Sequence, residues 1–67
     1  MTREVKVFEV AKSIAPVIVQ KGIELQERIS NSGGDPAKCM IGDKSIPEAY
    51  AEIIKYWSEI IVIELEK

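Results

Sequence analysis

The stretch SIPEAYAEIIKYWSEIIVIELEK, residues 45–67, decides the fold of this 67-residue chain. Its first residues have the pattern of a helix start. Ser45 and Glu48 have the spacing of a capping box, and Pro47 lies in the first turn, where its missing N–H costs nothing. We therefore predict a helix over about residues 46–66.

Apolar residues cover a wide part of this predicted helix. They spread over an arc of about 180–200°, whereas one packed face needs about 100°. The arc contains Ile46, Ala49, Tyr50, Ile53, Ile54, Tyr56, Trp57, Ile60, Ile61 and Ile63. A two-helix hairpin would leave half of the arc in water, so we expect a second chain to cover the rest. The predicted oligomer interface consists of Ile46, Tyr50, Ile53, Ile54, Trp57, Ile60 and Ile61.

Glu64 interrupts the apolar arc, because a helical wheel places it in line with Ile53 and Trp57. One interpretation is that Glu64 lies beyond the packed region. The other is that its carboxylate is buried and needs a cation such as Lys12 or Arg3. An antiparallel hairpin would bring either cation close to it.

A second periodic segment occupies the first half of the chain. Its apolar and small residues alternate at spacings of four and three, which is typical of a helix packed along one seam. They are Val7, Ala11, Ile14, Ile18, Gly22, Leu25 and Ile29. With Thr2 as N-cap and Glu4 in the first turn, the pattern predicts a helix over about residues 3–30. A short strand over residues 4–10 is the alternative, because several of its residues are β-branched.

Pro16 lies inside this predicted first helix. It removes one backbone hydrogen bond and crowds the carbonyl group of Lys12, at a cost of about 3 kcal/mol. We expect a kink or a short break there, which bends the helix around its partner.

Residues 31–44 form the predicted linker. Gly33 can adopt the left-handed conformation that ends a helix, and Pro36 prevents the helix from resuming. Gly42 and Asp43 indicate a turn. The rest of the linker is either a turn of helix or an irregular crossing.

Together these segments predict an all-α fold, a single-domain helical hairpin that assembles into a homo-oligomeric helix bundle. A chain of this length buries only about 60% of the surface that its unfolded form exposes. Cys39 is the single cysteine, so no disulfide within the chain can add stability. Association with other copies is the remaining means of support.

The residue inventory argues against an enzyme. The chain has no histidine, and nothing beside Cys39 supplies an orienting base, so a half-buried apolar role for this thiol is favoured over a reactive one. We expect no catalytic residue, metal site or cofactor. No stretch approaches the ~20 apolar residues of a membrane span, and we expect a cytoplasmic protein that does not enter membranes.

One binding constellation surrounds the start of the second predicted helix. Free backbone N–H groups, the hydroxyl of Ser45 and the amines of Lys38 and Lys44 make this end suitable for an anion. Tyr50, one turn further on, could stack on a base. The alternative is that Ser45 caps its own helix and that the lysines are solvated.

The segment DPAKCMIGDKSIPEA, residues 35–49, resembles part of a known family. It is similar to the hinge and second-helix start of the helical-hairpin domain in phage proteins that sequester cyclic-nucleotide immune signals, the anti-CBASS and anti-Thoeris sponges. Lys38 or Lys44 would stand for the family's basic residue and Ser45 for its threonine. Glu48 and Ala49 would match its acidic residue and alanine. The resemblance implies a homo-oligomer of hairpins that binds cyclic nucleotides without hydrolysing them.

Three functions follow as hypotheses. The first is a non-enzymatic, self-associating protein that acts by binding a partner, whether as an interaction module, an inhibitor or a scaffold. The second is an oligomeric sponge for cyclic nucleotides or related anionic immune signals. The third is a DNA-binding regulator, which is disfavoured because the net charge is -2 and its basic residues are dispersed.

Overall fold

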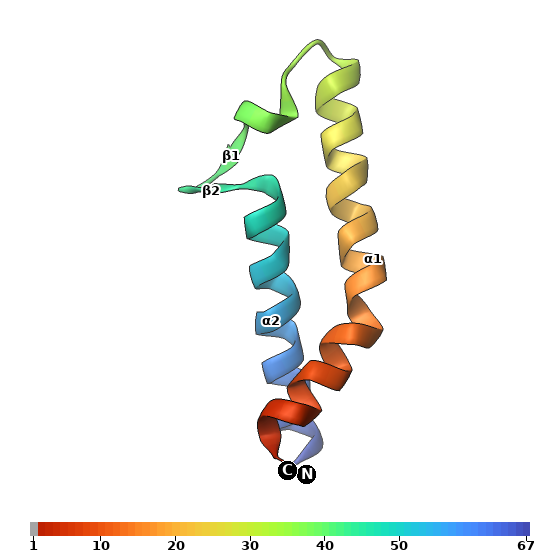
Figure 1. Ribbon diagram of the computed structural model, residues 1–67, viewed down its shortest axis with the longest axis vertical. Coiled ribbons are helices and arrows are strands. Elements are labelled where there is room, and N and C mark those ends of the chain that lie inside the picture. Colours follow the sequence, from red (N-terminus) through yellow and green to blue (C-terminus); the bar gives the residue numbers. More distant parts are fainter. Residues whose placement is uncertain (1) are drawn as a thin grey trace.

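The computed structural model describes residues 2–67 and contains two long helices joined by a short connecting segment (Figure 1). Helix α1 spans Arg3–Asn31 and helix α2 spans Ile46–Leu65. The helices lie side by side and antiparallel, so that the first and last turns of the hairpin are at the same end (Figure 1). The two predicted helices are confirmed. Residues 4–10 are helical, which excludes the alternative of a strand.

The ends of α1 are closed as the sequence indicates. At the start, the hydroxyl of Thr2 accepts a hydrogen bond from the backbone N–H of Val5. At the end, Gly33 has a φ of 91° and donates its N–H to the carbonyl of Ser30 at 3.1 Å. Gly34 donates to the carbonyl of Ile29 at 2.9 Å. This pair of bonds is a Schellman motif, which satisfies carbonyl groups that the last helical turn leaves free.

Pro16 lies inside α1 without ending it. The helix runs continuously through this residue, and Figure 1 shows it changing direction in the orange part of the ribbon. Beyond the bend, the first turns of α1 cross the end of α2. The proline thus produces a bend and not a break, and the bend directs the start of α1 toward its partner helix.

The connecting segment contains structure that the all-α prediction lacked. A 3-10 helix, η1, covers Pro36–Lys38 and is followed by a small antiparallel pair of strands, β1 at Met40–Ile41 and β2 at Lys44–Ser45. Gly42 begins the turn between the strands with a φ of 65°. The predicted turn is confirmed, but the strands are too short to show periodicity in the sequence. The fold is therefore mostly helical with a β-hairpin, and not purely α.

The contact between the helices uses the predicted seam of α1. All seven residues of that seam are buried or half-buried. On α2, Ile46 and Val62 are each 2% exposed and Ser58 is fully buried. Ser58 and Val62 therefore place the buried face of α2 to one side of Ile53 and Trp57. The helical wheel had placed those two residues at the centre of the apolar arc. Ser58 tolerates burial because its hydroxyl donates a hydrogen bond to the carbonyl of Ile54 at 2.6 Å.

Gly22 of α1 packs closely against an aromatic ring of α2. A β-carbon at this position would lie 3.2 Å from Cγ of Tyr50. Gly22 is the buried glycine of α1, and Tyr50 is half-buried. The small-residue position predicted from the sequence thus accommodates the tyrosine ring.

Candidate interaction surface

α2 carries a second apolar face, directed away from its contact with α1. It consists of Ile53, Tyr56, Trp57, Ile60 and Ile63, and we call it the outer face. Tyr56 is 63% exposed and Trp57 53% exposed. Ile60 is half-buried, and the other two isoleucines are exposed. A hairpin of two helices leaves these side chains in contact with water.

The outer face follows from the spacing of residues along α2. Ile53, Tyr56, Ile60 and Ile63 alternate at spacings of three and four, which lines them along one side of a helix. The buried residues Ser58 and Val62 lie on another side. One helix therefore presents two apolar faces, and α1 covers one of them.

A groove of about 560 Å³ lies at the upper end of the outer face. The β-hairpin forms one wall, and Figure 1 shows it projecting from α2 on the side opposite to α1. We call this groove the notch. It is lined by Ile41, Asp43, Lys44, Ala49, Glu52, Ile53, Lys55, Tyr56 and Glu59. An ion pair between Lys44 Nζ and Glu52 Oε1, 3.0 Å apart, joins the hairpin to the helix within it.

The residues of the predicted oligomer interface divide into three groups by exposure. Ile53 and Trp57 lie on the outer face with large exposed areas. Ile46 is buried within its own chain, where it is 2% exposed. Tyr50, Ile54, Ile60 and Ile61 are half-buried.

Tyr56 and Ile63 belong to the outer face, although the predicted interface did not include them. They are 63% and 44% exposed. The signal that identifies them is the spacing of three and four that they share with Ile53 and Ile60. On the helical wheel, this line of residues and the face that α1 buries formed one wide apolar arc.

The candidate anion site at the start of α2 is already occupied by groups of the chain. Ser45 Oγ accepts from the N–H of Glu48 at 3.4 Å and donates to its carboxylate at 2.7 Å. The hydrogen bond from Ser45 lowers the pKa of the Glu48 carboxyl group, so this negative charge persists at the positive end of the helix. Lys44 pairs with Glu52. The local alternative, a self-capped helix, describes this arrangement.

The other two candidate ligand residues do not converge on Ser45 as a shared site. Lys38 is exposed in η1. The ring of Tyr50 packs against Gly22 of α1. This contact covers part of the ring that would otherwise stack on a base. Cys39 is a free, half-buried thiol, in keeping with the apolar role predicted for it.

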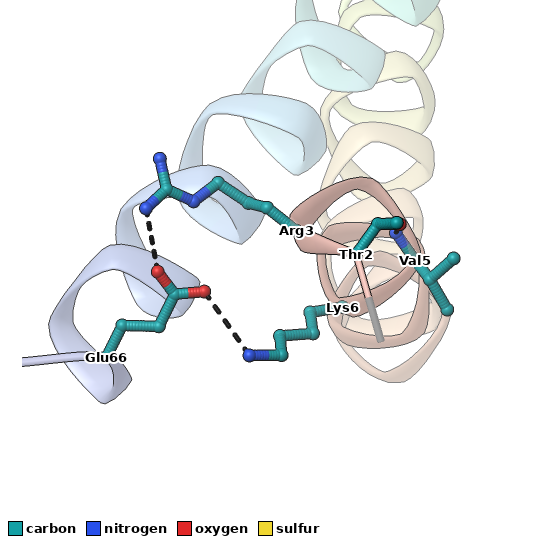
Figure 2. Close-up of polar contacts among 5 residues, drawn as sticks. All are labelled: Thr2, Arg3, Val5, Lys6 and Glu66. Carbon is teal, nitrogen blue, oxygen red and sulfur yellow. Dashed lines mark hydrogen bonds and ion pairs between the residues drawn. The ribbon is translucent and has the colours of Figure 1, made fainter.

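Basic residues of α1 pair with the end of α2 through Glu66, one residue beyond the helix. Figure 2 shows Arg3 and Lys6 on opposite sides of the Glu66 carboxylate, at 2.7 Å and 3.5 Å. The hydrogen bond from Arg3 lowers the pKa of Glu66, and the same bond raises the pKa of Arg3. Glu64 is exposed and pairs with Lys67 at 2.9 Å. The interpretation that Glu64 lies beyond the packed region is therefore correct. Arg3 forms its ion pair with Glu66 and not with Glu64.

Within residues 2–67, no three histidine, cysteine or acidic side chains gather in a way that could hold a metal ion. Neither helix combines the length and the apolar composition needed to cross a membrane, as judged over the same residues.

Comparisons with known proteins returned no matching family model, curated protein or solved structure.

Proposed function

We propose that this chain is a non-enzymatic binding protein that self-associates through the outer face of α2. The observation that carries the proposal is the exposure of two neighbouring aromatic side chains, Tyr56 and Trp57, within a line of isoleucines. Aromatic residues surrounded by aliphatic ones are the side chains that dominate binding energy at protein interfaces. Its biological role would then be interaction, inhibition or scaffolding.

The size of the molecule supports this proposal. The core between two helices contains few fully buried side chains, with Ile46, Ser58 and Val62 the largest of them. Covering apolar surface contributes about 25 cal/mol per Å², and an aromatic side chain can bury roughly 150–250 Å². Burial of the outer face against a second copy would therefore add stability that a small hairpin lacks by itself.

The exposed apolar residues of α1 make a less continuous surface. Phe8 is 61% exposed, but the amine of Lys12 lies 5.5 Å from its ring centroid. Val17 is 65% exposed. It falls on the other side of α1, since nine residues separate it from Phe8, a step of about half a turn beyond two full turns. These side chains are scattered, whereas those of the outer face are consecutive along one line.

A matched pair of variants tests the proposal. Tyr56→Glu places a charge in the outer face, and Val17→Glu places one at an α1 position of almost equal exposure, 65% against 63%. We expect Tyr56→Glu to abolish self-association at micromolar concentration and Val17→Glu to leave it intact. Sedimentation equilibrium measures the mass, and circular dichroism verifies that both variants are folded. Equal association of the two variants would refute the role of the outer face.

The sponge hypothesis has weaker support. Lys44 immediately precedes Ser45, but Ser45 and Glu48 satisfy that helix end from within the chain. A thermal-shift series with cyclic dinucleotides tests it, since stabilisation of the folded chain would favour a sponge and its absence would reject one. DNA binding remains the third hypothesis. The basic residues of the chain are dispersed along the sequence, which argues against it.

A further inference from the structure

We propose that one face of the β-hairpin belongs to the self-association surface, so that a second copy of the chain contacts Ile41 together with the outer face of α2. This inference rests on the proposed function, because it takes another copy of the chain as the partner and adds a second element to the contact. The β-hairpin is then part of an interface as well as a connection between the two helices.

The pairing of the strands decides which side chains of the β-hairpin face the notch. Side chains alternate between the two faces of a strand, and residues paired across two strands share a face. Ile41 pairs with Lys44, and both line the notch. Met40 pairs with Ser45, and neither of them lines it. The two exposed apolar residues of β1 therefore lie on opposite faces of the β-hairpin, and Ile41 is the one that faces the notch.

The notch joins Ile41 to the outer face. Its lining includes Ile41 from the β-hairpin and both Ile53 and Tyr56 from the outer face. Ile41 is 43% exposed, and the β-hairpin projects from α2 on the side opposite to α1 (Figure 1). Helix α1 therefore leaves this combined surface open. A partner that covers Tyr56 at the notch meets Ile41 as well.

The outer face alone is small for a stable dimer, because standard interfaces bury about 800 Å² on each partner. A whole aromatic side chain buries roughly 150–250 Å². At 63% and 53% exposure, Tyr56 and Trp57 therefore offer roughly 200–300 Å² together. The isoleucines of the outer face are smaller and more covered, with Ile53 37% exposed, Ile63 44% exposed and Ile60 half-buried. A further surface has to contribute, and the β-hairpin adjoins the outer face at the notch.

The charges around the notch suit contact with an identical surface. A two-fold dimer brings the same patch of both copies together, so a rim with one sign of charge would repel itself. The notch carries both signs, with carboxylates from Asp43, Glu52 and Glu59 and amines from Lys44 and Lys55. Lys44 Nζ and Glu52 Oε1 already pair at 3.0 Å. The rim is therefore nearly balanced in charge around apolar residues, which is the usual arrangement of a protein interface.

Two substitutions on opposite faces of β1 test the inference. Ile41→Glu places a charge on the face toward the notch, and Met40→Glu places the same charge on the other face, at a more exposed position, 56% against 43%. We expect Ile41→Glu to raise the dissociation constant by about ten- to a hundredfold, because a symmetric dimer loses the burial of two isoleucines. Met40→Glu should leave the dissociation constant unchanged. Sedimentation equilibrium measures both variants, and circular dichroism verifies that they are folded. Equal dissociation constants for the two would overturn the inference.

Protection of an introduced thiol tests the same contact without adding a charge. In a Cys39→Ser background, Ile41→Cys and Met40→Cys each place a single thiol on β1. We expect alkylation of the thiol from Ile41→Cys to slow as the protein concentration rises through the dissociation constant. The thiol from Met40→Cys should keep its rate. Equal dependence on concentration for the two thiols would contradict a contact through one face of the β-hairpin.

The unsubstituted chain and the outer-face variant separate the two levels of failure. An unsubstituted chain that stays a monomer refutes the proposed function itself. A dimer that Tyr56→Glu dissociates, but whose dissociation constant Ile41→Glu leaves unchanged, keeps the outer face and refutes the part of the β-hairpin alone.

Discussion

At the scale of single residues, a glycine of α1 and a serine of α2 lie at buried positions of the hairpin. Gly22 leaves the space that the ring of Tyr50 fills, and Ser58 is fully buried on α2. The sequence indicated the first, since Gly22 lay on the predicted seam of α1. It did not indicate the second, because a serine within a helix is as readily exposed as bonded back to a carbonyl group.

Replacement of Gly22 tests this contact. Gly22→Val should lower the free energy of unfolding by about 1–3 kcal/mol, because the added atoms would overlap the ring of Tyr50. The control is Gln20→Val, which introduces the same side chain at an exposed position of α1. Urea denaturation at a fixed protein concentration measures both. Equal losses for the two variants would show that valine acts through helix propensity and not through the tyrosine ring.

Glu66 gives the fold a defined response to acid. Arg3 holds the pKa of this carboxyl group below its ordinary value of 4.5. The stabilisation that this pair provides is therefore fully present above about pH 4.5, and it is lost as the pH falls through the lower pKa of the folded chain. The effect is small because both side chains are exposed to solvent.

The variant Glu66→Gln isolates this response. Above about pH 4.5, we expect the original chain to be more stable than Glu66→Gln, and we expect the two to converge as the pH is lowered further. Glu27→Gln controls for the loss of one negative charge. The comparison uses urea denaturation over a pH series at low salt. A difference between the two chains that grows on acidification would contradict the pairing of Glu66 with Arg3.

At the scale of elements, helix starts and ends were predictable because each depends on a few neighbouring residues. Thr2, Gly33 and Ser45 act at the expected helix ends. The β-hairpin was not predictable, since each strand has two residues and only Gly42 and Asp43 left a local signal. The side of α2 that packs against α1 was also not predictable, because the sequence does not say which part of the wide apolar arc α1 covers.

The Schellman motif makes the end of α1 sensitive to a single substitution. Gly33→Ala should cost about 1–2 kcal/mol, because an alanine in the left-handed conformation brings its β-carbon against the following carbonyl oxygen. No atom lies within 4 Å of a β-carbon placed there, so the cost would come from the backbone alone. Asn31→Ala, in the last turn of α1, is the control. If thermal unfolding gave equal midpoints for both, the closure at Gly33 would not limit stability.

At the scale of the whole molecule, the hairpin is long and thin, with extents of 47 × 21 × 16 Å. Such a shape gives α2 two long sides, and a single neighbouring helix can cover only one of them. The prediction that half of the apolar arc would stay in contact with water agrees with the exposure of Ile53, Tyr56 and Trp57. The anion site at Ser45 has no comparable support, because interactions within the chain satisfy it.

Self-association is the central claim, and the mass of the native chain in solution tests it most directly. Sedimentation equilibrium over a series of micromolar concentrations should give a mass above the 7.5 kDa of one chain, rising toward the two-fold value of an α2-to-α2 dimer. A folded chain that keeps a mass of 7.5 kDa throughout that series would contradict the claim.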